Sequence, residues 1–264
     1  MRTIATTPHG PRVQERDRPI CPPGWTRIRV AVAGVCRTDI AAARGELPVS
    51  SGRIIGHELA GWDPSGALVS VRPRLPDGRF LGLDLDGAFA EEIVVPTETL
   101  IRLPAGMSLR RAAFVEPAAA AMSVLRTSPG GRVALRGHGR IAELCRRVLV
   151  MAGVSLVSEA EGALDMLVLT GLDGVEDLSS VRRGGRVVLK GRPAGSVRLD
   201  QRAVVERELT LQGIDYGDFA ESARVLASGA LPVDDLFAEP LPLERFAEAF
   251  EDAEERKNFL LPGR

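Results

Sequence analysis

Cysteine is scarce in this chain, and the few cysteines it has are far apart. Cys21, Cys36 and Cys145 form no Cys-x-x-Cys pair. A disulfide framework and a four-cysteine structural zinc site both need paired cysteines, so both are excluded. Three isolated thiols fit a reducing compartment, and we therefore expect a cytoplasmic protein.

Long apolar runs and an excess of charge are missing as well. No stretch reaches the roughly 18 apolar residues of a membrane span, and the N-terminal stretch lacks the apolar segment of a signal peptide. The 34 basic and 35 acidic residues nearly balance, which offers no charged surface for nucleic acid or an anionic membrane. We expect a small-molecule partner, no nucleic acid and no membrane.

Aromatic residues make up only 4% of the chain, so Ala, Val and Leu must form most of its core. Hydrophobic residues at 45% and charged residues at 26% are ordinary values for a globular protein. A length of 264 residues is large for one domain and small for two full ones. We expect two reduced domains that share an interface.

The first part of the chain, up to residue 122, consists of short apolar runs separated by glycine and proline. The clearest runs are residues 27–33, 58–62, 67–71 and 90–95. This spacing predicts a small, barrel-like β domain. A helix is expected after Ser108, which can cap it, and Pro117 should place Glu116 at a break or in a new first turn.

Side chains of the kinds that bind zinc occur at three separate points in this part. Cys36 lies in Gly-Val-Cys-Arg-Thr-Asp, His57 and Glu58 follow Gly56, and Glu116 precedes a proline. A catalytic zinc takes three such ligands and leaves a fourth position open. Each carboxylate either binds the metal directly, accepts a hydrogen bond from a residue that binds the metal, or forms a salt bridge. These three alternatives stay open.

The second part begins with an apolar strand at residues 133–135 and a glycine turn. Gly137, Gly139 and Ala142 form a Gly-x-Gly-x-x-Ala turn that leads into a helix. Such a turn brings backbone amides and a helix N-terminus to a pyrophosphate. An acidic residue about 20 positions later should accept the ribose hydroxyls of NAD, and Glu159 fits, with Glu161 as the alternative.

This second part has no room for a complete dinucleotide-binding sheet. The apolar strand at residues 166–169 follows Glu159 closely, whereas a parallel crossover needs about a dozen residues or more. We expect a sheet that lacks its third strand. Residues 209–213 form a short apolar strand at the expected sheet edge, which predicts a homodimer.

Together, the Gly-Val-Cys-Arg-Thr-Asp, Gly-His-Glu and Glu-Pro motifs resemble the zinc-dependent medium-chain dehydrogenases/reductases, the alcohol and polyol dehydrogenase group. The resemblance covers nearly the whole chain and implies an α/β fold. A β-rich, GroES-like catalytic domain is expected at residues 1–122 and 232–264. A shortened Rossmann domain, with a doubly wound parallel sheet, is expected at 123–231. Residues 63–89 hold no cysteine, so the resemblance implies one catalytic zinc per chain without the structural zinc.

The resemblance assigns roles to four residues of the first two motifs. It implies that Cys36 and His57 bind the zinc. Thr38 is expected to relay the proton of the alcohol, and Asp39 to orient His57.

Further roles follow from resemblance to two branches of the family. Arg37 corresponds to an arginine that contacts the cofactor pyrophosphate in alcohol dehydrogenases. Glu116 stands where those enzymes have a third cysteine ligand and polyol dehydrogenases have glutamate. Glu58 is the other candidate for this third ligand and a candidate catalytic carboxylate.

The expected function is hydride transfer between a secondary alcohol and NAD or NADP. The substrate would be a polyol, cyclitol, sugar or amino alcohol, or the corresponding ketone. Two alternatives remain on the same scaffold: a non-redox zinc lyase or isomerase, and a catalytically silent binding protein.

Overall fold

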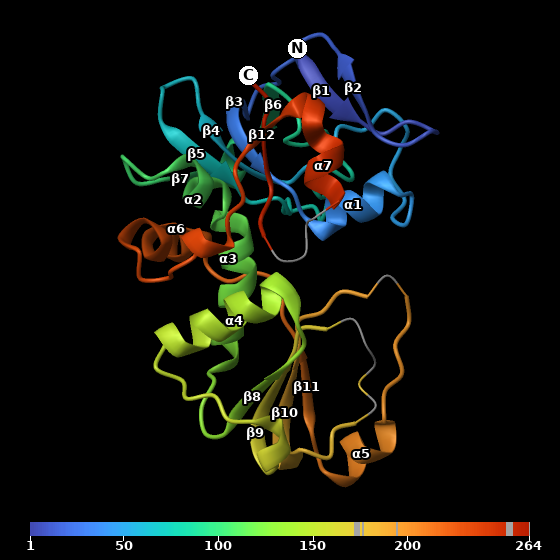
Figure 1. Ribbon diagram of the computed structural model, residues 1–264, viewed down its shortest axis with the longest axis vertical. Coiled ribbons are helices and arrows are strands. Elements are labelled where there is room, and N and C mark those ends of the chain that lie inside the picture. The colour runs from blue at the N-terminus through green and yellow to red at the C-terminus, as the bar shows by residue number, and fades with distance from the viewer. Residues whose placement is uncertain (172–174, 176, 194, 252–255, 264) are drawn as a thin grey trace. The chain divides into compact units, whose positions relative to one another are not determined.

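The structure is a computed structural model that describes residues 1–171, 175, 177–193, 195–251 and 256–263 (Figure 1). Its contacts divide the chain into two compact units, Met1–Pro117 with Phe219–Arg264, and Ala118–Asp218. Both boundaries differ from the expected ones at residues 122 and 231.

The difference at the second boundary comes from helix α6 (Phe219–Ser228). This helix packs on α2 (Leu109–Ala113) and β7 (Leu100–Arg102), and these contacts place it in the first unit. Its apolar face, with Ala223 and Leu226 buried, is the reason for that packing.

The described residues of the first unit form a mostly antiparallel sheet in the order β12-β13-β3-β4-β5-β7, with β6 paired to β3. The further strands are β3 (Trp25–Gly34), β4 (Glu58–Trp62), β5 (Leu68–Val71), β6 (Glu92–Pro96), β12 (Leu241–Pro242) and β13 (Phe259–Leu261). A separate hairpin pairs β1 (Arg2–Ala5) with β2 (Arg12–Glu15). The expected runs are therefore strands, within two residues of their predicted ends.

Short helices connect these strands and cover the sheet. They are α1 (Arg37–Ala43), α7 (Phe246–Glu251) and the 3₁₀ turns η1 (Thr97–Thr99), η4 (Asp234–Leu236) and η5 (Leu243–Arg245). Buried Ile, Val, Leu and Ala side chains from the strands form one core, to which Phe89 and Phe250 add aromatic rings. Ser108 caps α2, and a new helix, α3 (Val115–Met122), starts just before Glu116, as predicted.

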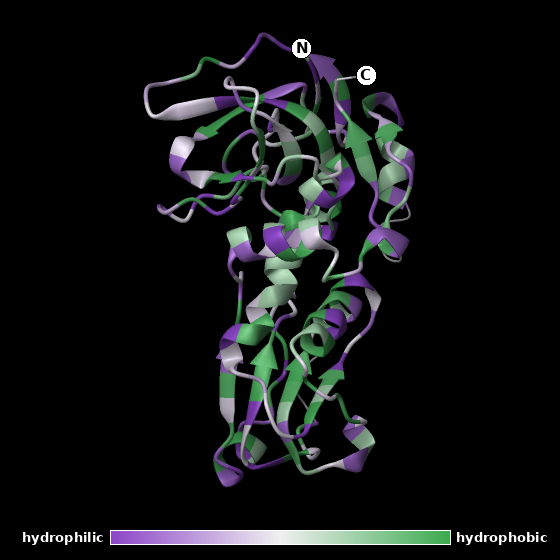
Figure 2. Cartoon of the chain, turned by 90° about the vertical axis from the view of Figure 1, so that its left-hand side faces the viewer, coloured by the Kyte–Doolittle hydropathy of each residue, from purple (hydrophilic) through white to green (hydrophobic). Residues whose placement is uncertain are grey.

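The second unit contains a parallel sheet in the order β11-β10-β9-β8. Its elements are β8 (Val133–Arg136), β9 (Leu164–Leu169), β10 (Val181–Leu189), β11 (Thr210–Gly213), α4 (Gly139–Met151), α5 (Gln201–Glu206), η2 (Ser123–Thr127) and η3 (Glu159–Glu161). Figure 2 shows hydrophobic stretches along this sheet. They belong mainly to β9 and the second half of β10, which are largely buried, whereas β11 is partly exposed.

The sheet is shortened beside β8. Residues 155–158, which precede Glu159 and stand where the second strand of such a sheet would be, make only one bridge, between Leu156 and Val133. The chain then passes through η3 directly into β9, and every residue of this connection is described. No third strand lies in it, as the sequence predicts.

No helix in the described part of the chain has both the length and the apolar character that a membrane crossing requires.

Candidate active site

Cys36 lies at the junction between β3 and α1, where the chain leaves the sheet. Its backbone N–H donates to Oδ2 of Asp39 at 2.9 Å, which satisfies a donor before the first turn of α1. A carboxylate in the first turn is also favoured by the helix dipole. The local sequence therefore fixes the positions of both the Cys36 thiol and the buried Asp39 carboxylate.

His57 is placed by the glycine that precedes it. Gly56 has φ +100°, and a Cβ atom there would lie 2.7 Å from the ring of Phe89. The carbonyl oxygen of Gly56 accepts a hydrogen bond from Ala88 N at 2.9 Å. Only glycine allows this close approach, and it sets His57 directly before β4, with its ring 5.1 Å from that of Phe80.

Cys36, His57 and Glu58 form the candidate metal centre. One ligand atom from each lies within 4.8 Å of the other two, and His57 and Glu58 are buried. Nδ1 of His57 lies 2.9 Å from Oδ1 of Asp39, so Nε2 is the ring nitrogen left for a metal. Thiolate, imidazole and carboxylate suit zinc, and the residues present therefore fit that metal.

The electrostatics of His57 follow from the same neighbours. Burial lowers the pKa of its imidazole, but the negative charges of Asp39 and Cys36 outweigh burial, and the net pKa lies well above the ordinary value. The pocket around His57 is therefore strongly favourable for positive charge, as a cation-binding site requires.

The two candidates for a third ligand differ in position. Glu58 lies in the metal group but also forms a buried ion pair with Lys257, Nζ to Oε1 2.5 Å. Glu116 is buried at 5% exposure in the first turn of α3, and its carboxylate is not part of that group among the described residues.

The two remaining residues of the first motif are more accessible. Thr38 is partly buried, and its Oγ1 lies 3.8 Å from Sγ of Cys36, beside the metal group. Arg37 is exposed on α1. The structure thus brings Cys36, Thr38, Asp39, His57 and Glu58 together, and leaves Arg37 at the surface of the first unit.

In the second unit, the glycine turn has the predicted order of strand, turn and helix. Gly137 ends β8 with φ +131°, and a Cβ atom there would lie 2.2 Å from Oγ1 of Thr170. Gly139 begins α4 at φ +75°, and Ala142 is buried one turn later. Close packing against Thr170 explains why a glycine is needed at position 137. A pyrophosphate could bind here because the backbone N–H groups at the start of α4 are not covered by side chains.

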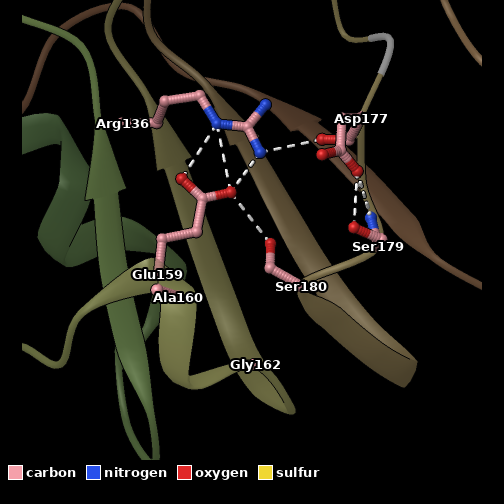
Figure 3. A pocket seen from close by; sticks show the side chains of 7 residues that line it. All are labelled: Arg136, Glu159, Ala160, Gly162, Asp177, Ser179 and Ser180. Atoms are coloured by element: carbon pink, nitrogen blue, oxygen red, sulfur yellow. Dashed lines mark hydrogen bonds and ion pairs between the residues drawn. The ribbon is translucent and has the colours of Figure 1, made fainter.

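Glu159 lies on η3, where its carboxylate already has partners (Figure 3). Arg136 donates from Nε at 2.9 Å and also from Nη2, and Ser180 Oγ donates at 2.9 Å. The hydrogen bonds from Arg136 hold the pKa of this carboxyl below its ordinary value. These side chains, with Asp177 and Ser179, line a cavity of about 560 Å³.

Two residues of these sites escaped sequence reasoning. Lys257 stands far from the metal motifs and carries no motif of its own. Arg136 immediately precedes Gly137, but nothing in the glycine pattern indicates that its side chain reaches Glu159. The only feature of the sequence that could have drawn attention to Arg136 is its position as a charged residue at the end of an apolar strand.

No family model matches the chain. A curated relative, the 2-dehydro-3-deoxy-L-galactonate 5-dehydrogenase of Pseudoalteromonas atlantica, is 25% identical over 86% of this chain and 87% of its own length. The alignment spans 297 positions, more than the 264 residues of this chain. The relative therefore contains segments that this chain lacks.

Solved structures share the fold. An alcohol dehydrogenase from Escherichia coli CFT073 in complex with NADH superposes with a TM-score of 0.88 at 20% identity, over 99% of both chains. The cobalt- and zinc-bound thermostable alcohol dehydrogenase of Pyrobaculum aerophilum gives 0.81 at 24% identity, also over 99% of both. The chain is therefore similar in sequence to a sugar-acid dehydrogenase and shares the fold of alcohol dehydrogenases, two of the groups that its zinc-ligand motifs resemble.

Proposed function

We propose that the chain is a zinc-dependent oxidoreductase that transfers a hydride between a secondary alcohol and NAD or NADP. The observation that carries this proposal is the group of Cys36, His57 and Glu58, with Asp39 behind the imidazole. Zinc in such a site would polarise the alcohol oxygen so that it ionises near neutral pH, and the nicotinamide would accept the hydride.

The chain's own residues would hold the metal and move the proton. Cys36 and His57 act as ligands, and Asp39 fixes the ring of His57 through Nδ1. The hydroxyl of Thr38, which lies beside Cys36 Sγ, takes the proton of the bound alcohol and passes it outward. The third ligand is Glu58 or Glu116, and we expect one zinc per chain.

The glycine turn would bind the pyrophosphate of the cofactor. Gly137 and Gly139 expose backbone, and α4 presents its N-terminus, while Ala142 packs close beneath. Arg37 is exposed on α1 of the first unit, and its resemblance to alcohol dehydrogenases makes it a further candidate for contact with the cofactor pyrophosphate. Glu159 would accept the ribose hydroxyls if it exchanged one of its present partners for them.

Several finer features belong to the same proposal. The substrate class is a polyol, cyclitol, sugar or amino alcohol, because Glu116 resembles the polyol branch. β11 pairs with β10 on one side and lies at the edge of the parallel sheet, which supports a homodimer formed through that edge. The scarcity of cysteine supports a cytoplasmic location.

The test combines metal analysis with hydride transfer. Protein purified without chelator should contain zinc and reduce NAD or NADP with a member of a polyol panel. Cys36→Ser with His57→Ala should abolish both zinc content and reduction. Activity that survives without metal would contradict the proposal.

Two observations favour a second function, a non-redox zinc lyase or isomerase. The second strand of the parallel sheet is reduced to a single bridge, and the Glu159 carboxylate is bound within the protein. Both would weaken a dinucleotide site while leaving the metal centre intact. Calorimetry with NAD and NADP separates the two functions, because a non-redox enzyme would keep its zinc and bind neither.

A further inference from the structure

Lysine is used at only two positions in this chain, Lys190 and Lys257, whereas the other basic residues, 32 of the 34, are arginines. Both lysines are buried, Lys190 at 6% and Lys257 at 1% exposure. Arginine therefore serves wherever a basic group meets solvent. A lysine fits where a compact ammonium is needed in an enclosed space, because the planar guanidinium is larger and requires more donors to be satisfied.

Lys257 reaches the candidate metal centre from the C-terminal end of the first unit. It stands just before β13, and its backbone is fixed by hydrogen bonds with Leu236 O at 2.6 Å and Ala238 N at 3.0 Å. Its ammonium donates to Val35 O at 2.8 Å and to Oε1 of Glu58 at 2.5 Å. The ion pair is thus held from both sides, and both side chains are 1% exposed.

The space around this pair is set by Gly34, which lies opposite Glu58 in the register of β3 and β4. A Cβ atom at Gly34 would lie 2.3 Å from Oε2 of Glu58 and 2.9 Å from Cε of Lys257. Glycine therefore leaves the room that the pair occupies. A larger residue at this position would displace the Glu58 carboxylate or the Lys257 side chain from the ion pair.

We infer that Lys257 is a positioning residue of the candidate metal centre, which binds the carboxylate of Glu58 and keeps it off the metal. This inference rests on the proposed zinc function. A catalytic zinc needs a position for water or substrate, whereas a site closed by protein ligands has none. Glu58 has an oxygen among the metal-ligand atoms, and it is the group best placed to close that position.

The reason is the cost of an unpaired charge in the core. Without Lys257, the buried Glu58 carboxylate would have no compensating cation, which is strongly unfavourable. A metal bound by Cys36 and His57 would then be the nearest source of positive charge, and Glu58 would bind it. This leaves Glu116 as the remaining candidate for the third protein ligand.

The test replaces the bound metal by cobalt(II), whose visible absorption reports the number and geometry of its ligands. Cobalt in the unaltered protein should give the intense bands of a four-coordinate site. Lys257→Met should shift these bands, because Glu58 takes the fourth position in place of water, and should lower kcat by about 10–100-fold, the loss typical of changes around a metal site. Glu58→Gln with Lys257→Met should restore the bands, because no carboxylate is left to bind.

A second readout needs no metal. Metal-free Lys257→Met should melt at a lower temperature than the metal-free unaltered protein, and the double variant should recover most of that loss, since it carries no unpaired charge. Lys190→Met, the same change at the other buried lysine, is the matched control and should leave the cobalt spectrum unchanged. If Lys257→Met does not fold, Lys257→Gln is measured in the same way.

The outcomes separate this inference from the proposed function. An unchanged cobalt spectrum in Lys257→Met, or bands that stay shifted in the double variant, would overturn the role of Lys257 while leaving a zinc enzyme intact. Failure of the unaltered protein to take up zinc or cobalt would instead overturn the metal centre itself.

Discussion

The carboxylate of Asp39 lies 2.9 Å from Nδ1 of His57 through one oxygen, and accepts the backbone N–H of Cys36 at 2.9 Å through the other. One buried side chain therefore orients both proposed zinc ligands. Cys36 and His57 are far apart in sequence, and their hydrogen bonds to Asp39 fix the position of one relative to the other.

Asp39→Asn should lower zinc affinity by about 10–100-fold, because the amide holds His57 less firmly and removes a negative charge behind it. Competition with a chromogenic zinc chelator measures the change. Asp77→Asn, in an exposed turn of the same unit, is the control and should bind zinc normally. Equal affinity in both variants would mean that Asp39 does not support the metal.

Thr38→Val should reduce turnover while zinc content stays constant. Valine keeps the shape of threonine but removes the hydroxyl that lies beside Cys36 Sγ, and a general acid–base step contributes roughly 10²–10⁴ in rate. Thr38→Ser, which retains the hydroxyl, should preserve most of the activity. Turnover and metal are measured on the same samples, and full activity in Thr38→Val would show that the proton leaves by another route.

A homodimer is expected in solution, because β11 is an edge strand of the parallel sheet that the described residues form. Light scattering at micromolar concentration should give twice the mass of the chain. Ile214 N donates to Leu189 O of β10, so by alternation the N–H of Leu211 faces the outer edge. Leu211→Pro removes this donor and should shift the protein toward monomer, whereas Val205→Ser, on an exposed face of α5, should not. A monomeric unaltered protein would contradict the prediction.

The sequence predicts the fold well because its signals are local. Short apolar runs between glycine and proline mark β4 and β6, Ser108 marks the start of α2, and Gly137 with Gly139 mark the turn before α4. Cys36 and His57 are also recognised together, since each stands in a motif. Glu58 was left with three alternatives, and its ion pair with Lys257 depends on the pairing of β13, close to the end of the chain, with β3.

The parts that sequence reasoning missed are long-range contacts of charged side chains. Arg136 and Glu159 are separated by the whole of α4, and the hydrogen bonds between them depend on how the shortened connection folds back beside β8. The grouping of helix α6 with the first unit could not be predicted for a similar reason. Its amphipathic pattern indicates that one face is buried, but does not identify the element on which that face packs.

Stability should fall at alkaline pH through Cys145, which is fully buried in α4. Burial raises its pKa to about 12, against 9.0 for a free thiol. The folded protein thus keeps this proton while the unfolded chain loses it, so the stabilisation present below about pH 9 is lost toward pH 12, by up to roughly 1.4 kcal/mol per pH unit.

Urea unfolding at several pH values between about 8 and 10.5 measures this loss. With one tyrosine and two lysines in the chain, few other groups titrate in that window. Cys145→Ala should flatten the dependence, and Cys21→Ala, at an exposed position, should leave it as it is. The same slope in both variants would assign the alkaline loss to another group.

The pair of Arg136 and Glu159 should limit the affinity for NAD, because the carboxylate proposed to accept the ribose hydroxyls is already bound by the guanidinium. Arg136→Met frees the carboxylate from its strongest partner and leaves Ser180 Oγ. NAD and ADP-ribose should then bind more tightly, and NADP should not, since a free carboxylate repels the 2′-phosphate. Calorimetry with the three ligands measures this, and Glu161→Gln tests the neighbouring carboxylate. If Arg136→Met left all three affinities unchanged while Glu161→Gln weakened NAD, the ribose contact would belong to Glu161.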